Sequence, residues 1–308
     1  MPNFENFIPQ ATADGSFTFF SQQFNEAFHS HFGAKQESFF KFVSPTQLEI
    51  VAHQPILRLL DICYGLGYNT AAALETIWRI NPHCYVELIG LELNPSVPQA
   101  AINHKLFDNW NYEHTDILTQ LAFKQEVQTE RLQGKLLIGD ARDAISSVHQ
   151  LGFQADAIFL DPFSPPQCPQ LWTVEFIQKV ALCLHVDGLL ATYSCAAAVR
   201  TALLTAGLQI GSTPPVGRRS PGTVAAHPQN SRFHTHSILP PLSYAEKEHL
   251  LTRAAIPYHD PYLNDQATII VQRRQQEQQA SSLEPTSRWR KRCMTQALPD
   301  FFSRIGGS

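Results

Sequence analysis

The sequence lacks the marks of a membrane-spanning, secreted or zinc-binding protein. No stretch reaches the roughly 18 uninterrupted apolar residues that a membrane-spanning helix needs. The N-terminus has neither the basic start nor the apolar run of a secretory signal. The six cysteines are scattered and never form a C-x-x-C pair, which argues against structural zinc and against a disulfide framework. We therefore expect a cytoplasmic protein with no metal and no membrane partner.

Charge is also scarce in this chain. Charged residues make up 16% of it and the net charge is −4, so the field of the whole protein does not indicate nucleic-acid binding, although a local basic patch is compatible with it. The hydrophobic share of 44% is ordinary for a folded protein. A length of 308 residues suffices for one large α/β domain with additions, or for two small domains.

An alternation of short apolar runs and amphipathic segments begins near residue 55. It is typical of a parallel sheet covered by helices. The expected strands span residues 56–62, 85–92, 135–139, 155–161 and 188–194. The expected helices span residues 69–80, 96–106, 141–150, 172–184 and 196–206. Because ligands gather at the carboxyl ends of parallel strands, the polar loops there form the candidate site.

Three regions are expected along the chain. A phenylalanine-rich cap of strands and helix covers residues 1–50, the sheet domain covers 51–240, and a helical extension covers 241–308. Within the sheet domain, the stretch from Gly211 to Gly222 is expected to be a loop. The extension is expected to hold helix from about 244 to 279 and to end in a basic tail.

A glycine-rich turn follows the first expected strand. Its sequence is Asp61-Ile62-Cys63-Tyr64-Gly65-Leu66-Gly67-Tyr68-Asn69-Thr70. Gly65 and Gly67 permit a sharp turn and a close approach of the backbone to a ligand. Asn69 and Thr70 suit the N-cap of the following helix, whose positive end favours a carboxylate. The missing third glycine argues against NAD, and the pattern favours another nucleotide-like cofactor over a purely structural turn.

Acidic residues end the next two strands. Glu92 is placed to accept hydrogen bonds from two ribose hydroxyls, and the alternative is a solvated residue that caps the strand. Asp140 is placed to accept a hydrogen bond from an adenine amino group, and equally well to be the N-cap of the next helix.

The fourth strand ends in the turn Asp161-Pro162-Phe163-Ser164. An amine that attacks a methyl group must be neutral, and its nitrogen gains positive charge in the transition state. A carboxylate such as that of Asp161 orients the amine and stabilises this charge, and an aromatic ring such as Phe163 stacks on a base or holds the developing cation. The turn resembles the Asp-Pro-Pro-Tyr type loop of amino-directed methyltransferases. Combined with the glycine-rich turn, it favours methyl transfer from S-adenosylmethionine to nitrogen over a loop that proline merely stiffens.

Several basic residues are candidate contacts to RNA phosphates. Each of them is also compatible with an ordinary solvated surface. The candidates are Arg200, Arg218, Arg219, Arg288, Arg290, Lys291 and Arg292. Trp289 lies within the last group and strengthens the interpretation, because bases stack on aromatic rings.

Taken together, these segments resemble the methyltransferase domain of the MnmC family, which completes 5-methylaminomethyl-2-thiouridine at the tRNA wobble position. The resemblance is most specific over residues 160–173, Leu-Asp-Pro-Phe-Ser-Pro-Pro-Gln-Cys-Pro-Gln-Leu-Trp-Thr, and extends over most of residues 15–220. Where the family usually has glutamate and glycine, this chain has Asp61 and Cys63. The oxidase domain that is fused in MnmC has no counterpart here, so the chain resembles a free-standing methyltransferase.

The resemblance implies a Rossmann-like class I S-adenosylmethionine-dependent methyltransferase of the α/β class, with a mostly parallel seven-stranded sheet and helices on both faces. It implies conversion of 5-aminomethyluridine, with or without 2-thiolation, to the 5-methylaminomethyl form in tRNA. The implied catalytic residues are Asp161 and Phe163. The implied cofactor-binding residues are Asp61, Tyr64, Gly65, Gly67, Asn69, Glu92 and Asp140.

Two alternatives share this fold. One is a methyltransferase or aminopropyltransferase for a small amine, which would not need RNA. The other is a catalytically silent RNA-binding relative, which Cys63 in place of a glycine favours.

Overall fold

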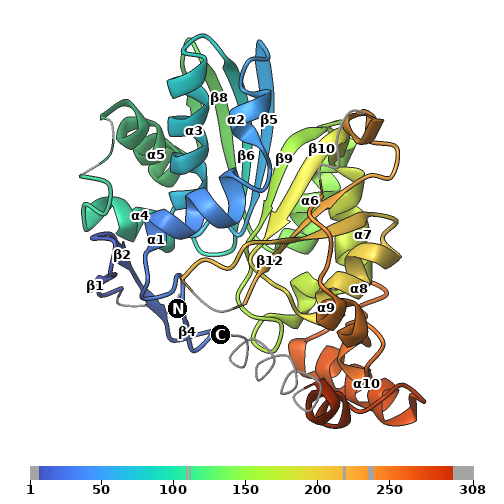
Figure 1. Cartoon of the computed structure of the whole chain (residues 1–308). Coiled ribbons are helices and arrows are strands. Elements are labelled where there is room, and N and C mark those ends of the chain that lie inside the picture. Colours follow the sequence, from blue (N-terminus) through green and yellow to red (C-terminus); the bar gives the residue numbers. More distant parts are fainter. Residues whose placement is uncertain (1–6, 109, 111, 218–219, 235–238, 294–308) are drawn as a thin grey trace, which may run out of the picture.

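The protein, seen here in a computed structural model that describes residues 7–108, 110, 112–217, 220–234 and 239–293, is built around an eight-stranded sheet (Figure 1). The strand order is β11-β12-β10-β9-β5-β6-β8-β7. The strands are β5 (Ile56–Ile62), β6 (Tyr85–Glu92), β7 (Glu126–Gln128), β8 (Leu132–Ile138), β9 (Ala155–Leu160), β10 (Leu184–Thr192), β11 (Gln209–Thr213) and β12 (Gly222–Ala226).

The centre of the sheet is parallel and its edges are antiparallel. Strands β10, β9, β5, β6 and β8 pair in parallel, whereas β12 and β11 on one side and β7 on the other pair antiparallel. The expected α/β class is therefore confirmed, but the sheet has eight strands rather than seven. The edge strands are short, and the loop expected between Gly211 and Gly222 is the connection between β11 and β12 with strand at both of its ends.

Helices cover both faces of the sheet (Figure 1). One face carries α3 (Tyr68–Ile80), α4 (Ser96–Asn103) and α5 (Tyr112–Lys124). The other face carries α6 (Ala141–Gln150), α7 (Val174–Leu182) and α8 (Ala197–Thr205). Side chains of β5 serve both hydrophobic cores, because Leu57 and Leu59 belong to the first and Leu60 and Ile62 to the second. This two-sided burial explains why the strand is mostly apolar, with Arg58 and Asp61 as its only charged residues.

The N-terminal segment consists of short elements that pack beside the carboxyl ends of the strands. It contains β1 (Gln10–Ala11), β2 (Phe17–Thr18), β3 (Phe20–Ser21), β4 (Glu26–Ala27), α1 (Ala34–Glu37), the π-helix η1 (Ser38–Val43) and α2 (Leu48–Val51). The π-helix packs on α3, and Phe42 meets Phe159 of β9 edge to face. We call residues 7–51 the N-terminal cap.

The C-terminal part differs from the expected continuous helix. It consists of α9 (Tyr244–His249), a 3-10 turn η4 (Arg253–Ala255) and α10 (Ala267–Ala280). Pro257 and Pro261 fall between the helices, and proline lacks the N–H that a continuous helix requires. The intervening loop docks on α7, where the Val174 N–H donates to the Tyr258 carbonyl over 3.0 Å. The division into three regions stays a prediction.

Neither a membrane-crossing helix nor a metal-binding cluster is found in the described part of the chain. Among the described residues, no helix is long and apolar enough to cross a membrane. Within the same residues, no group of three or more histidine, cysteine, aspartate and glutamate side chains is arranged to hold a metal ion.

Candidate functional site

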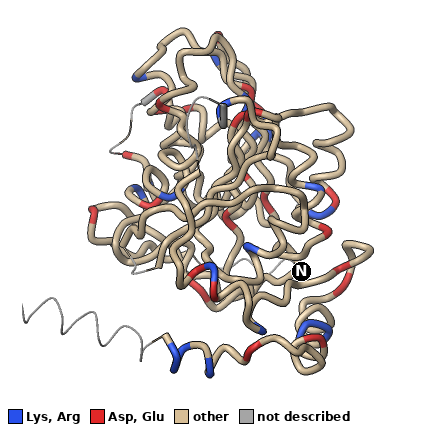
Figure 2. Tube along the Cα trace, turned by 45° about the vertical axis from the view of Figure 1, so that its right-hand side comes forward, with Lys and Arg blue, Asp and Glu red and all other residues tan. Residues whose placement is uncertain are grey.

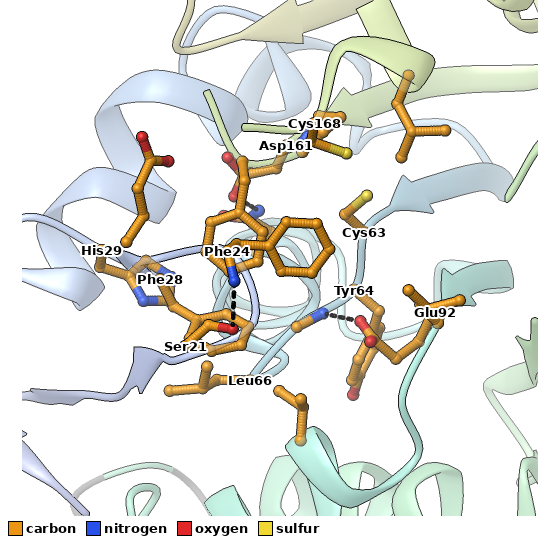
Figure 3. Close-up of a pocket in the computed structure, with 18 of the residues that line it drawn as sticks. Ser21, Phe24, Phe28, His29, Cys63, Tyr64, Leu66, Glu92, Asp161 and Cys168 are labelled. Carbon is orange, nitrogen blue, oxygen red and sulfur yellow. Dashed lines mark hydrogen bonds between the residues drawn. The ribbon is translucent and has the colours of Figure 1, made fainter. Parts of the chain in front are cut away.

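A cavity of about 500 Å³ lies at the carboxyl ends of β5, β6, β8 and β9, under the N-terminal cap (Figure 3). Its volume falls in the range of small-molecule sites. Chain order along the sheet reverses between β5 and β9, which is the switch point where α/β sheets bind ligands. In Figure 3, Glu92 and His29 lie at opposite sides of the view, with Phe24 and Asp161 between them.

The glycine-rich turn is held in a left-handed backbone. Cys63, Gly65 and Gly67 have φ angles of 65°, 55° and 98°. A side chain at Gly67 would place its Cβ 2.8 Å from the Tyr64 hydroxyl, so this glycine makes room for Tyr64 and does not itself line the cavity. Cys63 bears a conformation that costs a non-glycine residue about 1–2 kcal/mol and that a glycine would adopt without this cost.

Asn69 and Thr70 do not cap helix α3. The helix begins at Tyr68 with Gly67 as its N-cap, and no side chain caps it. Instead, Asn69 Nδ2 donates to Asp161 Oδ2 over 2.9 Å. Thr70 Oγ1 donates to Asp61 Oδ2 over 2.7 Å. The expected capping is therefore wrong, and Asn69 instead links the glycine-rich turn to Asp161.

Asp61 lies beneath the turn and outside the cavity lining. It is fully buried, and burial raises the pKa of its carboxyl to about 7. The hydrogen bond from Thr70 acts in the opposite direction and lowers this pKa. Its Oδ1 has no hydrogen-bond partner in the described part of the chain. The residue thus supports the turn from behind, through Thr70.

Glu92 borders the cavity at the end of β6. Its Oε2 accepts from the Gly65 N–H over 2.8 Å (Figure 3). Its Oε1 accepts from the Asn94 N–H over 2.8 Å. Burial raises the pKa of this carboxyl, and the two backbone bonds oppose that rise. A carboxylate oxygen accepts more than one hydrogen bond, so Glu92 keeps acceptor sites for hydroxyl groups of a ligand in the cavity.

Asp140 caps α6, since its Oδ1 accepts from the Arg142 N–H over 2.9 Å. The residue also lines the cavity. The Arg142 guanidinium binds the same carboxylate through Nη2 at 2.7 Å and reaches Asp260 Oδ2 through Nη1 at 2.9 Å. The N-cap role is therefore present, and Arg142 joins this corner of the cavity to the C-terminal loop.

Asp161 lies on the cavity wall at the end of β9. Burial raises its pKa well above the usual range, although the hydrogen bond from Asn69 opposes the rise. Phe163 stacks on Phe24 with ring centroids 4.5 Å apart, and Phe28 meets it edge to face at 5.0 Å. Asp161 is thus a half-buried carboxyl beside a half-buried aromatic cluster.

The N-terminal cap closes the cavity with contacts that the sequence did not predict. The Ser164 N–H donates to Glu26 Oε2 over 2.9 Å, and the Ser164 hydroxyl donates to the other oxygen. Glu37 and Lys41 form an ion pair of 2.8 Å on the cavity wall. Nothing in the local pattern of these charged residues separates them from surface residues. Their only signal is a position in the segment that resembles the family.

The basic residues occupy different environments. Arg200 is 2% exposed and forms a 2.7 Å ion pair with Glu246, so the expectation that it contacts RNA phosphates is wrong. Arg292 binds Glu248 and Glu284. Arg288, Arg290 and Lys291 are exposed, and Figure 2 shows this cationic run on an arm at the lower edge of the molecule. Arg218 and Arg219 lie outside the described residues.

The cavity fits a polar, nucleoside-sized cofactor. Three buried polar atoms of its lining have no hydrogen-bond partner in the described part of the chain, namely Tyr64 Oη, Asn69 Oδ1 and Gln170 Oε1. Buried polar groups normally find partners, so such atoms indicate a ligand that supplies them. Acceptors at Glu92 and Asp140 lie at one side of the same cavity.

Comparisons with known proteins point to methyltransferases. The sequence profile of a family described as S-adenosyl-L-methionine-dependent methyltransferase matches residues 104–228. An uncharacterized protein of Methanocaldococcus jannaschii is 27% identical over 267 residues, which cover 84% of this chain and 69% of that protein. The tRNA 5-methylaminomethyl-2-thiouridine biosynthesis bifunctional protein MnmC of Ralstonia nicotianae is 28% identical over 239 residues, which cover 73% of this chain and 35% of that protein.

A solved structure gives a more extensive match. The crystal structure of MnmC2 from Aquifex aeolicus superposes with a TM-score of 0.75 and 32% sequence identity, covering 91% of this chain and 87% of that chain. The chain spans about a third of the length of the bifunctional MnmC proteins it matches. The resemblance drawn from the sequence and the class I methyltransferase fold are both confirmed.

Proposed function

The chain belongs to the MnmC family of S-adenosyl-L-methionine-dependent methyltransferases, and we propose that it methylates the primary amine of 5-aminomethyluridine, with or without 2-thiolation, at the wobble position of tRNA. The substrate in this proposal is supported by the names of the bifunctional relatives and by the acidic, aromatic end of the cavity. The cytoplasmic location stays a prediction from the sequence.

We propose that the cofactor occupies the side of the cavity with Glu92 and Asp140. Glu92 would accept from the two ribose hydroxyls, and Asp140 from the adenine amino group despite its contact with Arg142. Tyr64 and Asn69, whose Oη and Oδ1 atoms have no partner in the described part of the chain, would hold the methionine portion. Gly65 would let the backbone of the turn approach the cofactor closely. S-adenosylmethionine supplies an electrophilic methyl group on a sulfonium centre. Asp61 and Gly67 would act from behind, by fixing the turn.

Asp161 is the residue on which the proposed chemistry depends. Its carboxylate would accept an N–H of the substrate amine, direct the nitrogen lone pair at the methyl carbon and stabilise the charge that the nitrogen gains. After the carbon–sulfur bond has broken and the carbon–nitrogen bond has formed, Asp161 would take the surplus proton. Asn69 would keep the carboxylate in this orientation through its 2.9 Å hydrogen bond.

The observation that carries this proposal is the position of Asp161. It lies on the wall of the cavity that also holds Glu92 and the glycine-rich turn, and the Phe24–Phe163 stack lies beside it. The aromatic rings of this stack offer a flat surface on which a pyrimidine base can stack. The exposed cations Arg288 and Arg290 would then contact the tRNA backbone.

Single-turnover methylation of an anticodon stem-loop that carries 5-aminomethyluridine tests this assignment. We expect Asp161→Ala and Asp161→Asn to slow the step by about 100-fold or more. Calorimetry should find their affinity for S-adenosylmethionine close to that of the wild type. Wild-type rates in both variants would remove Asp161 from the mechanism. An equal loss of cofactor affinity would instead assign it to cofactor binding.

A further inference from the structure

An ion pair on the cavity wall has no part in the chemistry described so far. Glu37 and Lys41 stand one turn apart in the N-terminal cap, and both line the cavity. Their side chains are only 9% and 8% exposed. Withdrawing two charges from water costs several kcal/mol per ion, and hydrophobic residues in place of such a pair are often as stable. A buried ion pair beside an active-site cavity is therefore a candidate functional group.

The hydrogen bonds of this pair are unevenly satisfied. Glu37 Oε2 accepts from the Ser30 N–H over 3.1 Å, and Oε1 accepts from the Ser30 hydroxyl and from Lys41 Nζ. Glu37 is thus held firmly in place. Lys41 Nζ has Glu37 as its hydrogen-bond acceptor within the described residues, and an ammonium group carries further N–H donors. These donors are available to a ligand in the cavity.

The surroundings of Lys41 favour a neutral acceptor over a phosphate. Glu37 already balances the charge of Lys41, so a buried phosphate would leave uncompensated negative charge in the site. Burial lowers the pKa of the neighbouring His29 to about 4, and this ring therefore adds no positive charge near neutral pH. A carbonyl oxygen meets the hydrogen-bonding need of Lys41 without this electrostatic cost.

Lys41 and Asp161 line the same cavity. Burial is the main cause that raises the pKa of the Asp161 carboxyl and Glu37 raises it further, whereas the Lys41 ammonium acts on the same carboxyl in the opposite direction. In 5-aminomethyluridine, the ring carbon that bears the O4 carbonyl is bonded to the carbon that bears the aminomethyl group. An amine held at Asp161 consequently brings O4 to the adjacent part of the wall.

We propose that Lys41, positioned by Glu37, donates a hydrogen bond to the O4 carbonyl of the reacting uracil ring and thereby selects uracil over cytosine. This inference rests on the proposed function. Cytosine carries an amino group in place of O4, and an amino group is a donor. Two donors would then face each other at Lys41, with one of them desolvated and unpaired. An unpaired donor of this kind separates two substrates in kcat/KM more strongly than a small difference in their size does.

The test compares two anticodon stem-loops that differ only in carrying 5-aminomethyluridine or 5-aminomethylcytidine. We expect the wild type to favour the uridine substrate in kcat/KM by about 10- to 100-fold. Lys41→Met should reduce kcat/KM on the uridine substrate by a similar factor and bring the ratio close to one. Lys35→Met is the matched control, because Lys35 belongs to the same cap but does not line the cavity. It should keep the wild-type ratio.

The double variant Glu37→Gln/Lys41→Met guards against a folding defect, because it leaves no unpaired charge. If Lys41 selects the base, the double variant unfolds near the wild-type temperature and still lacks the preference. If the pair is merely structural, the double variant regains the wild-type ratio, and the proposal for Lys41 is overturned. A wild type that methylates neither stem-loop would overturn the proposed function as well.

Discussion

Asp260 should control both the stability of the protein and its affinity for the cofactor. The residue is fully buried in the loop before α10. Its Oδ2 accepts from Arg142 Nη1 over 2.9 Å, and its Oδ1 accepts from the N–H groups of Asn264 and Asp265 over 3.1 and 3.2 Å. Arg142 in turn donates a hydrogen bond to the Asp140 carboxylate on the cavity wall. Replacing Asp260 with alanine removes all of these acceptors at once.

The expected loss of folding stability depends on the hydrogen bonds that Arg142 retains in the variant. Removing one partner of a buried ion pair costs about 3–5 kcal/mol. Arg142 retains Asp140 and the Asp265 carbonyl at 2.9 Å, so the lower end, about 3 kcal/mol, is expected for Asp260→Ala. For a chain of this size, that loss lowers Tm by roughly 5 °C. A less well anchored Arg142 should also weaken S-adenosylmethionine binding by about 1 kcal/mol, or roughly fivefold.

Thermal unfolding and calorimetric titration with S-adenosylmethionine measure the two effects. Asp116→Ala serves as the control, since Asp116 is exposed and its side chain accepts a hydrogen bond from the side chain of Gln120 at the helix surface. The control should change stability by less than about 0.5 kcal/mol. An unchanged Tm in Asp260→Ala would refute the anchoring role of the C-terminal loop. A lowered Tm with unaltered cofactor affinity would refute the link through Arg142.

Two further predictions concern charge. The pKa of Asp61, about 7 in the folded protein against an ordinary 3.8, means that the folded state favours the protonated carboxyl, so this group lowers stability as pH rises from about 4 to about 7. Asp61→Asn stays neutral, and its Tm relative to the wild type should therefore increase from pH 5 to pH 8; a difference independent of pH would contradict the assignment. Replacing Arg288 and Arg290 with alanine should weaken tRNA binding and flatten the dependence of log affinity on log salt by about 0.9 for each phosphate that the variant no longer neutralises. A double Lys105→Ala/Lys124→Ala control, at exposed lysines elsewhere, should keep the wild-type slope, and an equally steep slope in the arginine variant would mean that the tail lies away from the RNA.

The sequence predicted the central strands and the turns that follow them most accurately. Strands β5 and β6 follow the predicted bounds because a strand buried on both faces is mostly apolar along its length. The glycine-rich turn and the Asp161 turn were recognisable because each follows such a strand. Parallel strands bring their carboxyl ends to one edge of the sheet, and Glu92 and Asp161, which follow two such strands, line one cavity there.

Errors arose where a polar side chain had several partners to choose from. Asn69 and Thr70 are residue types that often cap helices. In the folded protein their side chains instead donate to the carboxylates of Asp161 and Asp61. Arg200 is chemically suited to phosphate, yet Glu246, 46 residues further along the chain, holds it in the interior. The pairing of Glu37 with Lys41 has ordinary helical spacing, and only the fold reveals that it faces a cavity.

The proposed reaction can be tested by mass spectrometry of nucleosides from tRNA incubated with the purified protein and S-adenosylmethionine labelled in its methyl group. One tRNA sample would carry 5-aminomethyluridine at the wobble position, and a matched sample would carry unmodified uridine. We predict labelled 5-methylaminomethyluridine from the first sample and no labelled uridine from the second. Cofactor binding without any labelled product from the first sample would contradict the proposed reaction.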